Sequence, residues 1–121
     1  MNGTVPTMTR RFVICDAWDV VVVPFPFTER AAVKRRPALV VSKKLFNRSG
    51  HSVMAMITSV KHQPWPGDTP VRDHRAAGLH VSCLVRLKIF TMDNRLMLKK
   101  AGKLSPADRD KTRRNIQLHV V

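Results

Sequence analysis

The sequence has few acidic residues and no tyrosine. Its 121 residues include 8 Asp and Glu against 22 Lys and Arg, which gives a formal net charge of +14 and a pI of about 11.4. A charge of this size carries information about partners and little about the fold. It favours nucleic acid, an anionic membrane surface or an acidic protein as the partner. Because the cations are spread along the chain, we expect a folded basic body and not a basic tail.

Cysteines and long apolar runs are also scarce. The two cysteines, Cys15 and Cys83, form no CxxC pair, so the sequence indicates free thiols in a reducing compartment and no disulfide framework. No apolar run approaches the roughly 20 residues that span a bilayer. The first residues lack the apolar segment of a secretory signal. These absences predict a cytoplasmic protein with no membrane association.

The motifs of the common catalytic sites are missing. The sequence has no GxxxxGKS/T or GxGxxG loop for phosphates and no GxSxG nucleophile elbow. The histidines have no HxxxH or HExxH spacing, and no cysteine lies at ligand spacing from any of them; they are His51, His62, His74, His80 and His119. We therefore expect no metal site, no cofactor and no nucleotide hydrolysis by a standard motif.

Length and apolar content fit one domain. Hydrophobic residues make up 44% of the chain, which is enough for one modest core. Residues 1–10 carry Gly, Pro, Thr and Asn without any periodicity. We predict that they form a flexible N-terminal segment and that residues 11–121 form a single domain.

Short β-branched or apolar runs, separated by turn signals, predict a set of strands. The predicted strands cover residues 19–23, 37–42, 53–59, 82–90 and 95–100, with a charged loop over 24–36 and one helical turn that ends at Gly50. Pro37 is placed first in its strand, where a missing N–H is tolerated. In the run 82–90, alternation predicts that Arg86 and Lys88 point to the same face.

One helix is predicted at the C-terminal end. Ser105 suits the N-cap position, Pro106 the first helical position and Asp108 the first turn. Short strands followed by a single helix indicate a small α+β domain of mostly antiparallel strands, with a curled sheet or a partial barrel.

Cations and hydroxyl groups lie at the ends of the predicted strands. Arg35 and Arg36 precede one strand, and Thr58 and Ser59 end the next; Arg86 lies inside a later strand. Such groups can cleave RNA without a metal, because the 2′-hydroxyl of the substrate is the nucleophile. Arginine matches phosphate oxygens in a bidentate way, and a threonine hydroxyl can donate to the same oxygens. Arginine stays protonated, so it suits charge stabilisation better than proton removal.

Four segments in order, DVVVVPFPFT, KRRPALVVS, MITS and LVRLKIFTMD, resemble the MazF/PemK family of toxin endoribonucleases. The resemblance runs from about Asp19 to the terminal helix. It implies a compact SH3-like barrel of the CcdB/MazF type with a C-terminal helix, and a homodimer. It also implies metal-independent cleavage of single-stranded RNA, which leaves 2′,3′-cyclic phosphate and 5′-hydroxyl ends, and an acidic antitoxin that covers the RNA groove.

The resemblance implies roles for individual residues. The family's Arg before Pro falls on Arg36 and its strand-end threonine on Thr58, so these two are the candidate catalytic residues. Some members carry a further Arg that matches Arg86, followed two places later by an Asp. Lys88 stands at that place here, which removes a candidate acid or base.

Other residues are candidates for RNA binding. They are Arg35, Ser59, Arg86, Lys88, Glu29 and Arg30, each with an ordinary solvated side chain as the alternative. Trp65 is a candidate for stacking on a base, although an isolated Trp in a loop more often packs against the protein. Other functions stay open at this point: an RNA binder without catalysis, a gyrase inhibitor like CcdB, or a basic ribosome-associated module.

Overall fold

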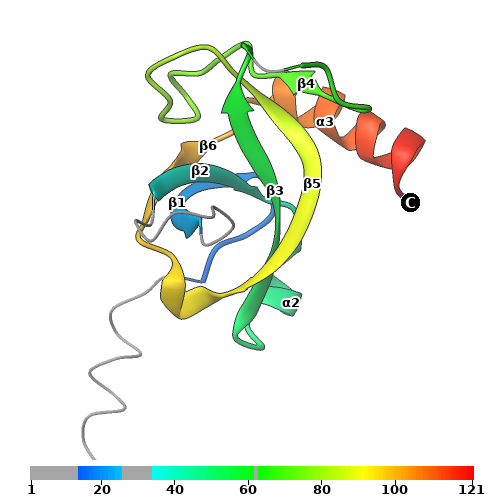
Figure 1. Ribbon diagram of the computed structural model, residues 1–121. Helices are drawn as coiled ribbons and strands as arrows, with labels where there is room; N and C mark the ends of the chain where they lie inside the picture. The colour runs from blue at the N-terminus through cyan, green and yellow to red at the C-terminus, as the bar shows by residue number, and fades with distance from the viewer. Residues whose placement is uncertain (1–13, 26–33, 62) are drawn as a thin grey trace, which may run out of the picture.

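The computed structural model describes residues 14–25, 34–61 and 63–121 (Figure 1). The predicted flexible segment, residues 1–10, and the RNA-binding candidates Glu29 and Arg30 lie outside the described residues. In chain order the elements are β1 (Asp19–Phe25), β2 (Lys34–Val40), α2 (Lys44–Asn47), β3 (His51–Ser59), β4 (Thr69–Pro70), β5 (Cys83–Asp93), the 3-10 helix η1 (Asn94–Leu96), β6 (Lys99–Lys103) and α3 (Pro106–His119).

The described strands form one sheet in the order β4-β5-β3-β2-β1-β6, and every neighbouring pair is antiparallel. The sheet curls, so that β5 bends around one side of the molecule while α3 lies at the end near β4 (Figure 1). Register shifts between Ala55 and Met56 and between Val20 and Val21 contribute to the curl, because bulges increase local twist. The predicted α+β class, with a curled antiparallel sheet and a C-terminal helix, is confirmed.

The central strands are buried on both faces of the sheet. Val20 and Leu39 belong to a core cluster on one face, whereas their chain neighbours Val21 and Ala38 pack with Met54 on the other. Successive side chains of a strand point to opposite faces, so each strand contributes to both clusters. This double burial explains why β1 reads as a continuous apolar run and does not alternate with polar residues.

The segment predicted as a loop over residues 24–36 is partly strand. β1 extends to Phe25 and β2 begins at Lys34, and these two residues pair with each other. The prediction that Pro37 begins its strand is therefore wrong, since Pro37 is the fourth residue of β2. The physical reason is that β2 pairs with β3 only from Ala38 onward. A strand segment with one partner leaves half of its backbone groups unpaired, so a residue without an N–H is tolerated there.

The limits of the strand predicted over residues 95–100 are also wrong. Residues Asn94–Leu96 form η1 instead, and β6 covers Lys99–Lys103. The Asp93 carboxylate accepts a hydrogen bond from the backbone N–H of Arg95 at 2.9 Å. This local cap stabilises a helical turn where composition alone favours a strand.

The C-terminal helix predicted from Ser105 is confirmed as α3. Ser105 Oγ accepts a hydrogen bond from the backbone N–H of Asp108, and Pro106 lies in the first turn. The buried Asp108 carboxylate accepts the N–H groups of Arg72 and Asp73 at 3.0 and 2.9 Å. Asp108, which was expected to stabilise the start of the helix, therefore also attaches α3 to the segment after β4.

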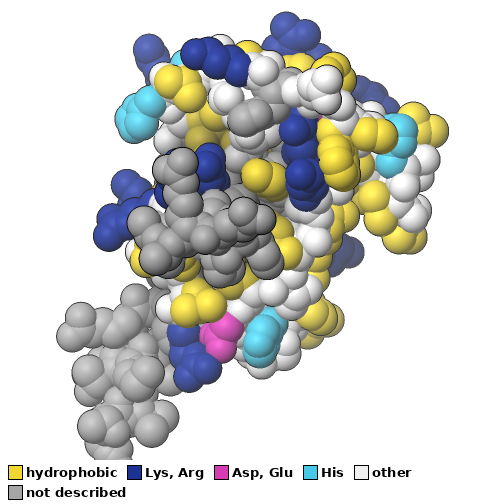
Figure 2. All heavy atoms as spheres, viewed as in Figure 1, with side chains coloured by type: hydrophobic (Ala, Val, Ile, Leu, Met, Phe, Trp, Pro, Cys, Tyr) yellow, Lys and Arg dark blue, Asp and Glu magenta, His cyan; other side chains and the backbone are white. Residues whose placement is uncertain are grey.

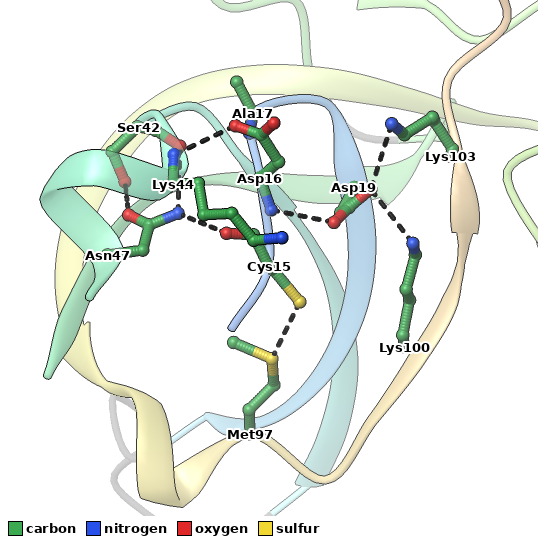
Figure 3. Close-up of polar contacts among 10 residues, drawn as sticks. All are labelled: Cys15, Asp16, Ala17, Asp19, Ser42, Lys44, Asn47, Met97, Lys100 and Lys103. Atoms are coloured by element: carbon green, nitrogen blue, oxygen red, sulfur yellow. Dashed lines mark hydrogen bonds and ion pairs between the residues drawn. The ribbon is translucent and has the colours of Figure 1, made fainter. Parts of the chain in front are cut away.

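A polar network attaches the residues before β1 to α2 and β6 (Figure 3). Asp16 accepts the backbone N–H of Lys44 at 2.9 Å. The buried Asp19 carboxylate accepts the N–H of Asp16 at 2.9 Å and lies 3.3 Å from the Lys100 ammonium and 3.6 Å from that of Lys103. One buried carboxylate thus holds two cations of β6 at fixed places.

Both cysteines are free and buried. Cys15 packs in one core cluster and Cys83 in the other. Burial raises the pKa of each thiol, because a thiolate is disfavoured away from water. The two cysteines therefore act as small apolar core residues.

An ion pair between Arg86 and Asp68 holds the segment between β3 and β4 against β5. The Arg86 guanidinium donates from Nε and Nη2 to the two Asp68 oxygens at 3.1 and 2.9 Å, and Nη2 also donates to the Gln63 carbonyl at 2.6 Å. Burial alone would raise the pKa of Asp68, but the hydrogen bonds from Arg86 and from the Trp65 N–H lower it below its usual value. Only 8% and 15% of the two side chains are exposed, so the pair is well shielded from solvent.

The loop before β5 packs closely on β6. Gly78 has a φ of 72°, and a Cβ built on it would lie 2.1 Å from the Ala101 carbonyl oxygen. The backbone N–H of Lys103 donates to the Ala76 carbonyl at 3.1 Å. This contact requires glycine at position 78 and fixes the residues that follow it.

We expect Asp68→Asn to lower the free energy of unfolding by about 3 kcal/mol at neutral pH, because it leaves a buried guanidinium without its charged partner. Urea denaturation measures the change. The Asp68 pKa is lowered in the fold, so its stabilising effect is present above the unfolded value of about 3.9 and is lost as the pH falls through the folded value. The difference between wild type and Asp68→Asn should therefore shrink in acid.

Asp93→Asn is the matched control for this prediction. Asp93 also pairs with an arginine, Arg95, whose hydrogen bonds lower the pKa of Asp93 to about 2, but 64% of the Arg95 side chain is exposed. Exposed pairs contribute little, and Asn still caps η1. Equal losses of stability in the two variants would contradict the assigned role of the Arg86–Asp68 pair.

A second prediction concerns Gly78. Gly78→Ala should lower the free energy of unfolding by about 2–3 kcal/mol, because the added methyl group meets backbone that cannot give way. Gly50→Ala is the control, since Gly50 also has a positive φ, 115°, but nothing lies within 4 Å of the added carbon. In Gly50→Ala, the backbone strain of a positive φ alone should lower the free energy of unfolding by about 1 kcal/mol. Thermal denaturation compares the two, and a Gly78 variant no less stable than the Gly50 variant would refute the close packing.

Candidate functional site

Strands β2 and β3 separate beyond the pair formed by Ala38 and Met56. Their ladder covers Ala38 to Val40, and the described residues show no pairing of Lys34–Pro37 with Ile57–Ser59. Continuing the same register would place Arg36 opposite Thr58 and Arg35 opposite Ser59. Residues opposite each other in a sheet point to the same face. The two candidate catalytic residues thus face the same side of a gap between two strands.

Each side of the gap is held by a different partner strand. The Lys34–Pro37 part of β2 stays paired with β1, where Arg36 lies opposite Val23. The end of β3 stays paired with β5, where Thr58 lies opposite Leu84. Because each rim stays paired with its other neighbouring strand, the gap is a built feature of the sheet and the residues on its rims are held in place.

A hollow of about 640 Å³ opens at this gap. Arg35, Arg36, Thr58 and Ser59 line it together. Thr58 is buried, Arg36 and Ser59 are half-buried, and Arg35 is exposed. The structure therefore brings four of the sequence-predicted residues to one place.

Three further residues of the hollow were not predicted from the sequence. Lys99 and Lys100 line it from β6, and His80 lines it from the loop before β5. Their approach depends on the pairing of Val22 with Lys99 across β1 and β6 and on the packing of the His80 loop against β6. No local pattern encodes these long-range contacts, although the run of two lysines is visible in the sequence.

The hollow combines an apolar lining with four cations. Arginine and lysine side chains line it, and no described residue in its lining is Asp or Glu. Cys83 also lines it, but burial raises the pKa of this thiol and keeps it neutral. Figure 2 shows Lys and Arg side chains at several places on one face of the molecule and very few acidic ones. Such a site suits a polyanion, and the arginine guanidinium groups suit phosphate in particular, because they can donate two hydrogen bonds to its oxygens.

Arg86 and Lys88 lie apart from this hollow. Arg86 is held by Asp68 and is 7% exposed, so its guanidinium already has partners. Both cations lie over the Trp65 ring, with Lys88 Nζ 4.6 Å and Arg86 Cζ 6.0 Å from its centroid. This shared contact agrees with the prediction that the two residues point the same way.

Residues 14–25, 34–61 and 63–121 contain no group of three or more His, Cys, Asp or Glu side chains that could hold a metal ion. In the same part of the chain, no helix has both the length and the apolar character needed to cross a membrane.

Several solved structures have the same fold. An endoribonuclease in complex with its cognate antitoxin from a mycobacterial species is 16% identical, with a TM-score of 0.68, and the match covers 87% of this chain and 91% of that one. MazF from Deinococcus radiodurans is 22% identical, with a TM-score of 0.67 and coverages of 88% and 96%. A MazE–MazF complex from the same organism is 21% identical, with a TM-score of 0.68 and coverages of 90% and 98%. The predicted MazF-type fold is confirmed.

The sequence itself was compared with protein families. No curated protein matches the chain. The family described as the PemK-like, MazF-like toxin of type II toxin–antitoxin systems matches residues 16–120, which is nearly the whole chain and includes every described residue that lines the hollow. The chain belongs to this family of PemK-like and MazF-like toxins.

Proposed function

We propose that this protein is the toxin of a type II toxin–antitoxin system and acts as an endoribonuclease that cleaves single-stranded RNA without a metal ion. The observation that carries the proposal is the gap between β2 and β3, which places Arg36 and Thr58 on the same face at the rim of one cationic hollow. Family membership and the endoribonuclease of a mycobacterial species that shares the fold support it.

In the proposed reaction the 2′-hydroxyl of the substrate loses its proton to solvent and its oxygen attacks the adjacent phosphorus. The bond to the 5′-oxygen breaks, and that oxygen takes up a proton from solvent. The products are a 2′,3′-cyclic phosphate and a 5′-hydroxyl. The Arg36 guanidinium offsets the negative charge that develops on the phosphorane, and the Thr58 hydroxyl donates to the same oxygens. Their rigid strand positions favour this role, because donors that are already in place need little rearrangement during the reaction.

Other residues bind the RNA around the scissile phosphate. Arg35 and Ser59 occupy the next positions along the two rims of the gap, where strand alternation turns their side chains to the other face of the sheet, and they are proposed to bind a neighbouring phosphate or sugar. Lys88 is exposed and available to phosphate, whereas the Arg86 guanidinium is already paired with Asp68. Glu29 and Arg30 lie outside the described residues and stay predictions.

The proposed partners follow from the family and from charge. A net charge of +14 suits both RNA and an acidic antitoxin, and MazF of Deinococcus radiodurans has been solved together with MazE. We expect the antitoxin to cover the cationic hollow and so to compete with RNA. A homodimer and a cytoplasmic location, where messenger RNA is translated, stay predictions.

Purified protein incubated with a long single-stranded RNA in excess EDTA should produce new 5′-hydroxyl ends, which enzymatic 5′-labelling and gel electrophoresis detect. Arg36→Ala and Thr58→Ala should each lower the single-turnover rate by about 100-fold or more, because each removes a donor to the developing charge. Arg48→Ala and Thr91→Ala are matched controls at exposed positions and should cleave at the wild-type rate.

Two outcomes would contradict the proposal. If folded wild-type protein binds the RNA in EDTA but leaves it intact, the chain is a binder and not a nuclease. If cleavage occurs but the Arg36 and Thr58 variants keep the wild-type rate, the site is wrong while the activity stands.

A further inference from the structure

Trp65 presents an aromatic ring on the face of the sheet that carries Thr58. We propose that this ring is the stacking platform for a base next to the scissile phosphate, and that Arg86 is a positioning residue that holds Trp65 in place. The inference rests on the proposed function, since it assigns a contact to the same RNA. It concerns a residue outside the hollow.

The backbone around Trp65 is restricted from both sides. Trp65 lies between Pro64 and Pro66, and proline fixes its own φ and keeps the preceding residue extended. The N–H of Trp65 donates to the Asp68 carboxylate at 2.9 Å, and the N–H of Asp68 donates back to the Trp65 carbonyl at 3.1 Å. The turn from Trp65 to Asp68 is therefore closed by two hydrogen bonds.

Arg86 attaches this turn to the sheet. Its guanidinium contacts both carboxylate oxygens of Asp68 and the carbonyl of Gln63, so it holds the chain on either side of Trp65. With its side chain 8% exposed and paired to a carboxylate, Arg86 is poorly placed to bind phosphate. The contacts of Arg86 therefore hold the turn that carries the Trp65 ring.

The ring itself is accessible. Trp65 is 41% exposed, although the segments on both sides of it are held. Lys88 Nζ lies 4.6 Å from the ring centroid, within the range of a cation–π contact. An aromatic ring on a held turn, together with an exposed ammonium group, offers a base and its phosphate the two contacts that single-stranded RNA sites combine.

Strand register places this platform near the proposed cleavage site. Arg86 lies opposite Met56 across β3 and β5, and Thr58 follows two residues along the same face. Two strand residues span about 7 Å and adjacent strands are separated by about 5 Å. The separation of Arg86 and Thr58 is thus on the scale of neighbouring nucleotides.

Trp18, the second tryptophan of the chain, provides an internal control. It is half-buried against a core cluster, and Arg113 Cζ lies 5.3 Å from its ring centroid. We do not expect it to contact RNA. Because the chain has two tryptophans, replacing one leaves the other as the single indole fluorophore.

The test uses a short 2′-O-methyl RNA that spans a mapped cleavage site and cannot be cleaved. In the Trp18→Phe protein, binding should quench the remaining Trp65 fluorescence by half or more, because a stacked base lies against the indole. In the Trp65→Phe protein, the Trp18 signal should stay within a tenth of its starting value at the same saturation, which anisotropy of a labelled oligonucleotide verifies. An abasic position at the stacked base should remove the quenching.

Cleavage assays separate this inference from the proposed function. Trp65→Leu should raise the apparent dissociation constant for RNA by about tenfold or more, and Trp65→Phe, which keeps an aromatic ring, should raise it by less. Arg86→Lys should reduce the quenching seen in the Trp18→Phe background, since the turn is held less firmly.

If wild type cleaves RNA but Trp65 is not quenched and Trp65→Leu binds normally, the platform is refuted and the nuclease stands. If RNA binds and quenches Trp65 but is not cleaved, the platform stands and the nuclease is refuted.

Discussion

The site depends on one event in the sheet, the separation of β2 from β3 beyond Ala38 and Met56. Up to that pair the two strands share a ladder; beyond it β2 stays with β1 and β3 stays with β5. The backbone N–H and C=O groups that line the gap would destabilise the fold if they had neither hydrogen-bond partners nor access to water. Pro37 reduces that cost because it carries no N–H, and the hollow gives the remaining groups access to solvent or to a ligand.

Two well-shielded carboxylates each hold a cation in place. Asp19 holds Lys100 at the edge of the hollow, and Asp68 holds Arg86 under the turn that carries Trp65. In a chain with so few acidic residues, these two are used inside the protein and leave the surface basic. Removing the carboxylate of such a pair leaves an uncompensated charge in a shielded place, which is why these pairs are expected to be sensitive to substitution.

The sequence alone was sufficient for the class of fold and the helix from Ser105, because strand composition and capping residues are local signals. It also singled out Arg36 and Thr58, which line the same hollow, while their catalytic role stays a prediction. It was insufficient for the start of β2, since one-sided pairing made Pro37 acceptable within a strand. It also missed Lys99, Lys100 and His80, which reach the hollow only after the sheet has curled. Arg86 shows the same limit: its position was predicted, but its pairing with Asp68 depends on a long-range contact.

The most direct measurement is a crystal structure of the protein with a 2′-O-methyl RNA that spans a cleavage site. The account predicts that the phosphate 3′ to the modified nucleotide lies at the gap between β2 and β3, with its oxygens within hydrogen-bond distance of the Arg36 guanidinium and the Thr58 hydroxyl. A well-ordered RNA bound elsewhere, for example along the basic side chains of α3, with the gap empty, would contradict it.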